Sequence, residues 1–138
     1  MEIHQAKTKQ DFAYVASLFN SKNNKYIWPK FQTAKQVEQN CSHTRRYYLL
    51  LVNKKPVGWF NIRLSDNKEA TIGMIIDHLY QGKGFGKQTM DLINKEAKKL
   101  GMKKLRLEVF VDNKRAVNLY KQAGFRETAK VLIMEKKI

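Results

Sequence analysis

The chain is poor in several residue types, and each shortage excludes a class of structure. It has one cysteine, Cys41, so no disulfide can form within it, which agrees with a reducing, cytoplasmic setting. Its histidines, His4, His43 and His78, are scattered without the spacing of metal ligands. No apolar run approaches the about 18 residues of a membrane-spanning helix, and the N-terminus does not resemble a secretory signal. We therefore expect a cytoplasmic protein with no metal and no membrane partner.

Acidic side chains are also scarce: 12 of them stand against 27 Lys and Arg, which gives a net charge of +15. The excess is spread along the whole chain and forms no basic tail. Positive charge of this size attracts polyanions. Three interpretations stay open: a solvated lysine-rich surface, steering of an anionic ligand, and binding of nucleic acid.

The residues that are plentiful predict a single folded domain over residues 1–138. Of the 138 residues, 43% are hydrophobic and 11% aromatic, which is enough to bury a core. The spacing of apolar residues predicts an α+β fold with helices flanking a mixed, mainly antiparallel sheet. A right-handed β-α-β crossover should join the strands at 70–77 and 104–110. We expect strands at residues 2–6, 47–52, 57–64, 70–77, 104–110, 125–128 and 131–136, and helices at 9–20, 33–41, 85–100 and 113–123.

The most informative segment is a glycine-rich turn between a strand and a helix. It reads Gln81-Gly82-Lys83-Gly84-Phe85-Gly86. Glycine allows a positive φ and a close approach of the backbone to a ligand. The first amides of a helix have no intrahelical partner, and the helix dipole favours negative charge there. The turn therefore predicts a phosphate-bearing ligand, although a turn that only starts a helix has the same pattern.

Two common phosphate-binding loops do not fit this turn. A P-loop requires Gly-Lys followed by Ser or Thr, whereas Lys87 is followed by Gln88. A dinucleotide-binding loop requires a third glycine where the chain has Thr89, and it belongs to the first strand of its sheet. The identity of the ligand therefore depends on other motifs.

Those motifs lie in the second half of the chain and supply a resemblance. The pattern Gln-x-x-Gly-x-Gly at Gln81, Gly84 and Gly86 resembles the acetyl-CoA loop of the GCN5-related N-acetyltransferases, the GNAT family. The resemblance continues through that family's next strand, its next helix and its last strand, in residues 105–109, Asn113, Ala116, Leu119, Tyr120, Gly124, Phe125 and 134–136. It is strongest over residues 70–125.

The resemblance implies the GNAT acyl-CoA N-acyltransferase fold and acetyl-CoA as cosubstrate. In that fold the strands corresponding to 70–77 and 104–110 splay apart at one end and admit the pantetheine arm. Strand backbone would hold the arm and polarise the thioester carbonyl, and loop amides would hold the pyrophosphate. Gln81 stands where the family more often has Arg, so one positive charge is missing. The implied cofactor-binding residues are Met74, Ile75, Ile76, Gln81, Gly82, Lys83, Gly84, Phe85, Gly86, Lys87, Asn113, Ala116 and Tyr120.

Acetyl transfer to an amine needs a general acid for the thiolate and a general base for the ammonium. The resemblance implies Tyr120 as the acid; the other interpretation is a core aromatic, because Tyr120 shares a helix face with Ala116 and Leu119. Asn113 is expected to cap its helix and to contact CoA. For the base we expect Glu108, which breaks the apolar pattern of its strand, and a solvated or ion-paired Glu108 is the alternative. Further candidates for the base are Glu69, Asp77 and His78.

The sequence does not define the acceptor. Loop aromatics and one strand aromatic are expected either to shape an amine pocket by cation–π contact or to pack on the core: Tyr26, Trp28, Phe31 and Trp59. We expect transfer to a primary amine of a small molecule, a protein N-terminus or a lysine, by direct attack in a ternary complex, with Cys41 inert. The alternative is a non-enzymatic module that senses CoA or binds nucleic acid. A ribosome-associated target, from charge alone, and a homodimer are further hypotheses.

Overall fold

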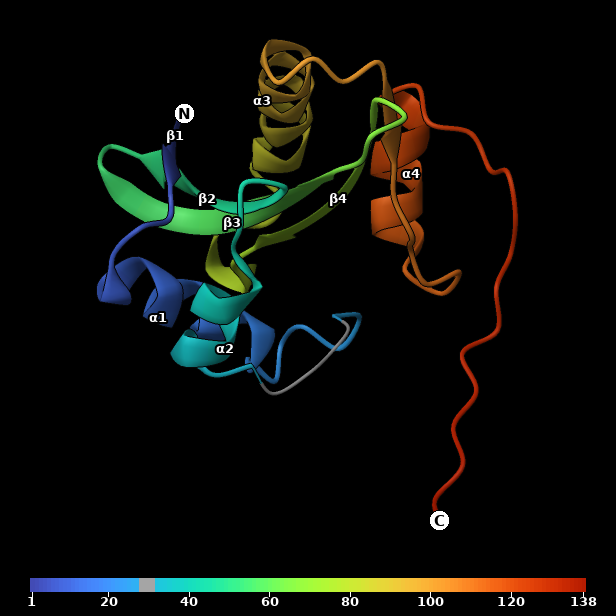
Figure 1. Cartoon of the computed structure of the whole chain (residues 1–138), viewed down its shortest axis with the longest axis horizontal. Coiled ribbons are helices and arrows are strands. Elements are labelled where there is room, and N and C mark those ends of the chain that lie inside the picture. Colours follow the sequence, from blue (N-terminus) through green and yellow to red (C-terminus); the bar gives the residue numbers. More distant parts are fainter. Residues whose placement is uncertain (28–31) are drawn as a thin grey trace.

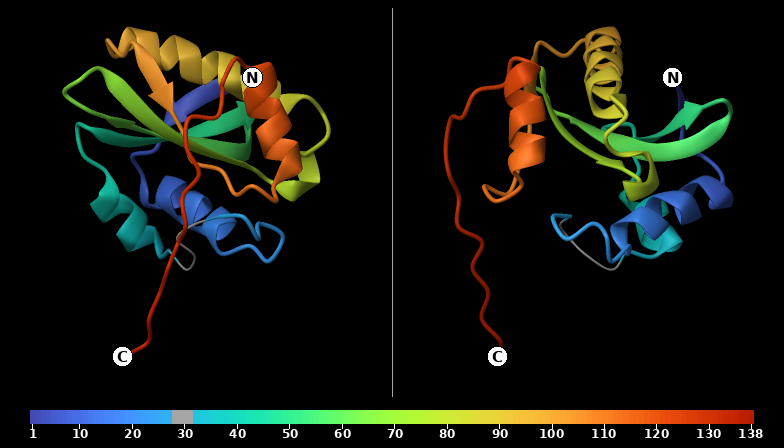
Figure 2. Two further views of the ribbon diagram at one scale, coloured as in Figure 1. Left: turned by 90° about the vertical axis from the view of Figure 1, so that its right-hand side faces the viewer. Right: turned by 180° about the vertical axis from the view of Figure 1, so that it is seen from behind.

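A computed structural model, which describes residues 1–27 and 32–138, shows one sheet between layers of helices (Figure 1). The strands are β1 (Glu2–Gln5), β2 (Arg45–Val52), β3 (Lys55–Leu64), β4 (Glu69–Ile76) and β5 (Lys104–Arg106). The helices are α1 (Lys9–Phe19), α2 (Ala34–Asn40), α3 (Phe85–Lys99) and α4 (Lys114–Gln122), with a short 3₁₀ turn, η1 (His78–Tyr80). The helices α1 and α2 lie on one side of the sheet and α3 on the other, with α4 beside its β5 edge (Figures 1 and 2).

The sheet has the strand order β1-β2-β3-β4-β5. The first four strands pair antiparallel with their neighbours, and only β4 and β5 run parallel. Parallel neighbours need a crossover, which α3 supplies between β4 and β5. The expected α+β fold with a mixed, mainly antiparallel sheet is therefore confirmed.

Local side-chain chemistry sets the starts of α1 and α2. Both begin with a capping box, in which a threonine caps the helix and the residue three positions later binds back to the threonine N–H. In α1, the Thr8 hydroxyl accepts from the Asp11 N–H at 3.1 Å, and the Asp11 carboxylate accepts from the Thr8 N–H at 3.1 Å. Thr33 and Gln36 form the same pair at α2.

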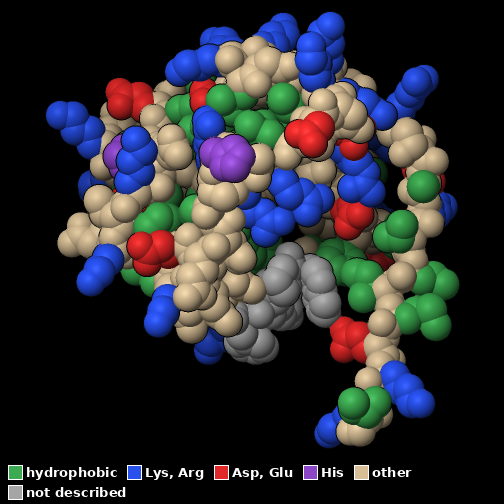
Figure 3. All heavy atoms as spheres, viewed as in Figure 1, with side chains coloured by type: hydrophobic (Ala, Val, Ile, Leu, Met, Phe, Trp, Pro, Cys, Tyr) green, Lys and Arg blue, Asp and Glu red, His purple; other side chains and the backbone are tan. Residues whose placement is uncertain are grey.

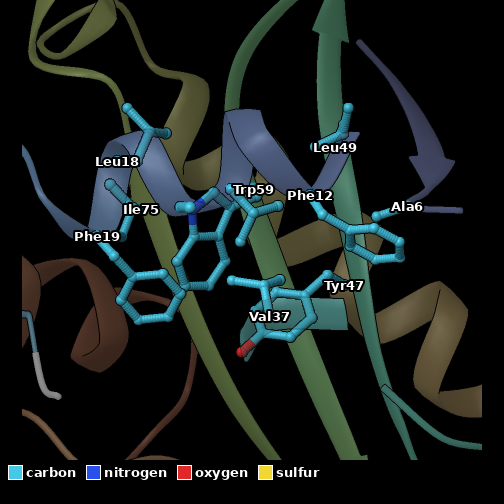
Figure 4. Packing of buried hydrophobic residues seen from close by; sticks show 11 residues of the cluster. Ala6, Phe12, Leu18, Phe19, Val37, Tyr47, Leu49, Trp59 and Ile75 are labelled. Atoms are coloured by element: carbon cyan, nitrogen blue, oxygen red, sulfur yellow. The ribbon is translucent and has the colours of Figure 1, made fainter. Parts of the chain in front are cut away.

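Two apolar layers hold the fold together, one on each face of the sheet. Adjacent strand residues point to opposite faces, so Trp59 packs toward α1 and Phe60 toward α3, and both are buried. On the α1 side, the ring centroid of Trp59 lies 4.8 Å from that of Phe19, with the two rings tilted, and 5.3 Å from that of Tyr47, which meets it edge-on (Figure 4). Trp59 is thus a core residue and not part of an acceptor pocket.

Three of the expected strands differ in the structure. The strand expected at 104–110 is paired over only 3 residues, because its chain turns away from β4 after Arg106. The strands expected at 125–128 and 131–136 are wrong: these residues form no strand, and residues 126–138 are exposed. After α4 the chain runs away from the body as an extended segment (Figure 2). An apolar, β-prone segment becomes a strand only beside a partner edge, and no described residue pairs with this one.

Candidate functional site

The strand β4 loses its outer neighbour part-way along its length. It pairs with β5 at three positions only: Glu69 with Lys104, Ala70 with Leu105, and Thr71 with Arg106. The strand then continues to Ile76, while β5 has ended. Within the described residues, the edge of β4 beyond Thr71 has no strand beside it. The expected divergence of the two strands at one end is therefore present, and we call the space along this edge the slot.

Backbone groups of β4 point into the slot. The Asp77 N–H donates to the Val57 carbonyl at 2.9 Å, so Asp77 faces β3. In an antiparallel pair, alternate residues turn their N–H and C=O toward the same neighbour. Met74 and Ile76 therefore direct these groups toward the slot, whereas Ile75 directs them toward β3 and packs its side chain in the core. Of these three expected residues, two direct backbone groups toward the slot, and the Ile76 carbonyl among these groups is engaged by the Gln81 side chain.

The glycine turn lies directly after the slot and η1, at the start of α3. Gly84 is the N-cap of α3 with φ +82° and forms no side-chain cap. No atom lies within 4 Å of the position that a Cβ on Gly84 would take, so the space above it is open. The Gln88 N–H is bonded to the Gly84 carbonyl at 3.3 Å, and the preceding amides, those of residues 85–87, have no intrahelical partner. This arrangement suits an anion at the helix start.

Gly86 has a different reason to be glycine. A Cβ there would lie 3.0 Å from Cδ2 of Leu119 on α4, which is tighter than ordinary packing allows. The glycine therefore lets α3 and α4 approach each other beside the turn. This close approach brings the start of α4 to the same place as the loop.

The side chain of Gln81 is engaged by the protein itself. Its Nε2 donates to the Ile76 carbonyl at 2.9 Å, and its Oε1 accepts from Arg115 Nη1 at 3.5 Å. Gln81 thus joins the slot edge of β4 to the first turn of α4. It positions the loop and brings an arginine to it.

Arg115 is the residue that the sequence interpretation missed. Its Nη2 lies 3.5 Å from the position of a Cβ on Gly82, so a guanidinium stands against the glycine turn. A signal was present in the sequence: Lys114 and Arg115 open a helix that has no acidic residue in its first turn. Cations are unfavourable at a helix N-terminus unless an anion compensates them. The expected contributors Lys83 and Lys87 are exposed, and Lys83 Nζ lies 5.8 Å from the centre of the Tyr80 ring.

The helix α4 also presents Asn113 and Tyr120. Asn113 caps the helix, since its Oδ1 accepts from the Ala116 N–H at 3.3 Å. Tyr120 packs edge-on against Phe125 at 5.9 Å and joins the apolar layer that contains Met74 and Phe85. Burial raises the pKa of Tyr120, so its hydroxyl keeps its proton at neutral pH. That hydroxyl has no hydrogen-bond partner among the described residues and is available as a donor.

The carboxylates expected as bases occupy different places. Glu108 lies beyond the end of β5, is 64% exposed, and pairs with Arg106 Nη2 at 3.0 Å. Glu69 pairs with Lys104 at 3.2 Å at the closed end of β4, away from the slot. At the other end, Asp77 Oδ1 lies 3.2 Å from His78 Nδ1 and accepts from the Leu79 N–H at 3.2 Å.

Tyr26, one of the aromatic residues expected to shape an acceptor pocket or to pack on the core, contacts the segment after β5. The Tyr26 hydroxyl donates to the Asp112 carbonyl at 3.2 Å, and its ring lies 6.2 Å from that of Phe110. Lys25 Nζ lies 5.0 Å from the centre of the Tyr26 ring. Trp28 and Phe31, also expected here, lie outside the described residues. Tyr26 therefore ties the loop after α1 to the segment that follows β5.

Comparison with known proteins shows the family of this chain. The model of the acetyltransferase (GNAT) family matches residues 15–125. The chain belongs to the GNAT family. A relative in Bacillus subtilis (strain 168), the uncharacterized N-acetyltransferase YycN, is 35% identical over 100 residues, which cover 70% of this chain. The matched region spans 63% of that relative, less than two thirds of its length.

Solved structures of GNAT proteins share the fold at low sequence identity. A spermidine N-acetyltransferase from Vibrio cholerae in complex with CoA and spermine has a TM-score of 0.82 and 22% identity, covering 93% of this chain and 82% of its own. The aminoglycoside acetyltransferase AAC(6')-Ib in complex with coenzyme A has a TM-score of 0.76 and 18% identity, and the match covers 94% of this chain and 87% of that chain. In the described part of this GNAT chain, no helix is long and apolar enough to cross a membrane.

Proposed function

We propose that this chain is an N-acetyltransferase that moves the acetyl group of acetyl-CoA to a primary amine by direct attack in a ternary complex. One observation carries the proposal: the free backbone edge of β4 leads into the open glycine turn at the start of α3. Acetyl-CoA has an extended pantetheine arm with the thioester at one end and phosphates at the other. This shape matches an unpaired strand edge that is followed by the free amides of a helix start. Membership of the family supports the same ligand.

The residues along this path fit acetyl-CoA, which supplies the acyl thioester when bound. The N–H and C=O of Met74 and the N–H of Ile76 would hold the pantetheine arm, and the amides of residues 85–87 would hold the pyrophosphate. Gln81 lacks the positive charge that the family more often has at this position, and Arg115 supplies that charge from α4. Arginine suits this role because its planar fork binds phosphate oxygens in pairs.

The proton transfers are assigned to Tyr120 and Glu108. The amine nitrogen attacks the thioester carbonyl carbon, the carbon–sulfur bond breaks, and the Tyr120 hydroxyl gives its proton to the departing sulfur. Glu108 accepts the proton of the ammonium through a water molecule, since one carboxylate oxygen is held by Arg106 and the other is free. Cys41 has no part in the reaction, because it lies at the end of α2 and burial raises the pKa of its thiol.

The charge of the chain bears on the acceptor. Spermidine and aminoglycosides, named in the structural relatives, carry several positive charges. The net charge of +15 repels such molecules, and the carboxylates Glu69 and Glu108 are already paired with basic side chains. The acceptor is therefore an amine on a neutral or acidic molecule, such as an N-terminus or a lysine of an acidic protein segment.

Two measurements test these statements. Calorimetric titration should show saturable binding of acetyl-CoA that ATP, as an anion control, does not reproduce; equal binding of both would contradict a CoA-specific site. The rate of acetylation of a peptide whose lysine is flanked by glutamates is then compared with the rate of acetylation of spermidine as the salt concentration is raised. We expect salt to slow the first reaction and to speed the second, because screening removes attraction in one case and repulsion in the other. The opposite pattern would refute the choice of acceptor.

A further inference from the structure

We propose that three arginines on one face of the sheet, Arg45, Arg63 and Arg106, form a carboxylate-binding subsite for the acceptor. The subsite would select a peptide segment in which an acidic side chain lies one or two residues from the amine that receives the acetyl group. We call these three residues the arginine row. The inference rests on the proposed function, because it names the group that would orient the acceptor at the same site.

Strand pairing places the arginine row in one line across the sheet. Arg45 on β2 lies directly opposite Arg63 on β3. On β4, Thr71 lies opposite Arg63 and is aligned with Arg106 of β5. Residues aligned across neighbouring strands direct their side chains to the same face, and the strands are about 4.8 Å apart. Arg63 and Arg106 therefore flank Thr71 at a backbone separation of roughly 10 Å, which their long side chains can bridge.

The arginine row lies on the accessible part of the face that α1 and α2 cover elsewhere. Ala70 and Ile72 are buried on the α3 side, so Thr71 between them faces the α1 side together with the row. The helices α1 and α2 pack on this face around Trp59, further along the strands. Arg63 and Arg106 are exposed, and Arg45 is half-buried. Figure 3 shows Lys and Arg side chains gathered near the centre of the view, over the end of the sheet.

The charges of the row are not compensated within the described residues. Like charges directly opposite each other destabilise a sheet, and neither Arg45 nor Arg63 forms an ion pair in the described part of the chain. Arg106 donates to Glu108 Oε1 at 3.0 Å through Nη2, which leaves its other N–H groups for a ligand. A guanidinium binds a carboxylate through two parallel hydrogen bonds, and a carboxylate is the anion that an unmodified peptide offers. Charge complementarity therefore selects an acidic peptide segment as the occupant.

The row lies at the end of the slot where the amine would react. The ladder between β4 and β5 ends at Thr71 and Arg106, and the slot begins there. With the phosphates of acetyl-CoA at the glycine turn beyond Ile76, the thioester end of the pantetheine arm lies toward Thr71. A carboxylate on the row would then lie roughly 7–10 Å from the reacting amine, which is two or three residues of extended chain. It would also hold the acceptor beside Glu108, the proposed base, to which Arg106 is bonded.

Steady-state kinetics with two lysine peptides test the proposal. The peptides are identical except that one has glutamate and the other glutamine on both sides of the lysine. The wild type should favour the glutamate peptide by about tenfold in kcat/KM. Arg63→Gln should remove most of this preference, mainly by raising KM for the glutamate peptide, and Arg63→Lys should retain part of it. Equal kcat/KM for the two peptides with the wild type would overturn the proposal, and this comparison needs no variant.

Arg46→Gln is the matched control, because it removes the same charge from the same strand on the other face of the sheet. Arg46 is aligned with the buried Ile62, and its Nη2 donates to the His43 carbonyl at 3.3 Å. This variant should keep the preference for the glutamate peptide. An equal loss of preference in Arg46→Gln and Arg63→Gln would show an effect of net charge alone and would overturn the subsite.

A binding measurement separates the subsite from the proposed function. Fluorescence anisotropy of the labelled peptides is measured on the chain saturated with CoA, which has no acetyl group to transfer. The wild type should bind the glutamate peptide more tightly than the glutamine peptide, and Arg63→Gln should bind the two alike. This result without acetylation of either peptide would support the subsite and refute the proposed function. Acetylation of both peptides at equal rates, with equal binding, would refute the subsite and support the proposed function.

Discussion

Two glycines that flank α3 offer a matched test of the proposed cosubstrate site. Gly84 at the start of the helix has φ +82°, and Gly101 just beyond its end has φ +81°. Neither position has an atom within 4 Å of the place where a Cβ would lie. Aspartate at either position therefore meets the same open space and the same left-handed backbone strain, about 1 kcal/mol. The two variants differ only in what lies beside them.

Gly84→Asp should weaken binding of acetyl-CoA by about a hundredfold. A carboxylate at this position would lie roughly 5 Å from a phosphate held by the amides of residues 85–87. Unit charges at that distance, with an effective dielectric constant of about 20, repel by about 3 kcal/mol, which is about two decades in affinity. The same carboxylate would also compete for the free amides at the start of α3. Gly101→Asp should bind acetyl-CoA as the wild type does.

Isothermal titration with acetyl-CoA gives the affinities, and thermal unfolding gives the stabilities. Gly101→Asp should unfold about 4 °C lower, as expected for about 1 kcal/mol in a chain of this size, and should retain its affinity. Gly84→Ala adds strain without charge and should lose far less affinity than Gly84→Asp. If Gly84→Asp and Gly101→Asp bind acetyl-CoA equally well, the glycine turn is a helix start and not a phosphate site.

Three further predictions concern single side chains. Arg115→Ala should raise the Kd for acetyl-CoA about tenfold, measured by titration, and Arg115→Lys should restore part of it; an unchanged Kd would remove Arg115 from the site. Tyr120→Phe should lower kcat about a hundredfold and leave the Kd for acetyl-CoA unchanged, whereas a core-packing role would alter the melting temperature instead. Burial, followed by the nearby charge of Asp77, raises the pKa of Tyr14. The folded state therefore favours the protonated phenol of Tyr14. The contribution of this phenol to the free energy of unfolding is complete below the ordinary pKa of about 10 and is lost as the pH rises above it. Tyr14→Phe should therefore reduce the loss of stability above pH 10 in denaturant titrations, and it removes a buried hydroxyl that has no partner among the described residues.

Elements whose determinants are local in sequence could be predicted. The helices expected at 9–20 and 33–41 are present as α1 and α2, and their caps, Thr8 and Thr33, each bond to a residue three positions later. The left-handed turn at Gly84 likewise depends on glycine itself. Such features follow from hydrogen bonds and steric limits within a few residues, so the sequence alone carries them.

Features that depend on distant neighbours could not be predicted in the same way. The apolar run that contains Leu105 and Val109 has the pattern of a full strand, but only residues beside β4 are paired. Residues 131–136 have strand propensity but no partner among the described residues. Arg115 reaches the loop only because Gly86 allows α3 and α4 to approach closely. In each case a pairing or packing contact decides the outcome, and that contact joins residues far apart in the chain.

The slot has its origin in the path of the chain after Arg106, the last residue that pairs with β4. Where the chain turns away from β4, it leaves the N–H and C=O of Met74 and the N–H of Ile76 facing the slot, and it also loses the ladder that would hold residues 107–111 in place. The proposed base, Glu108, lies in this segment, and its position matters because a displaced base cannot reach its proton. The Tyr26 hydroxyl bonds to the Asp112 carbonyl directly after this segment, so the loop after α1 helps to hold in place the residues that β4 no longer pairs.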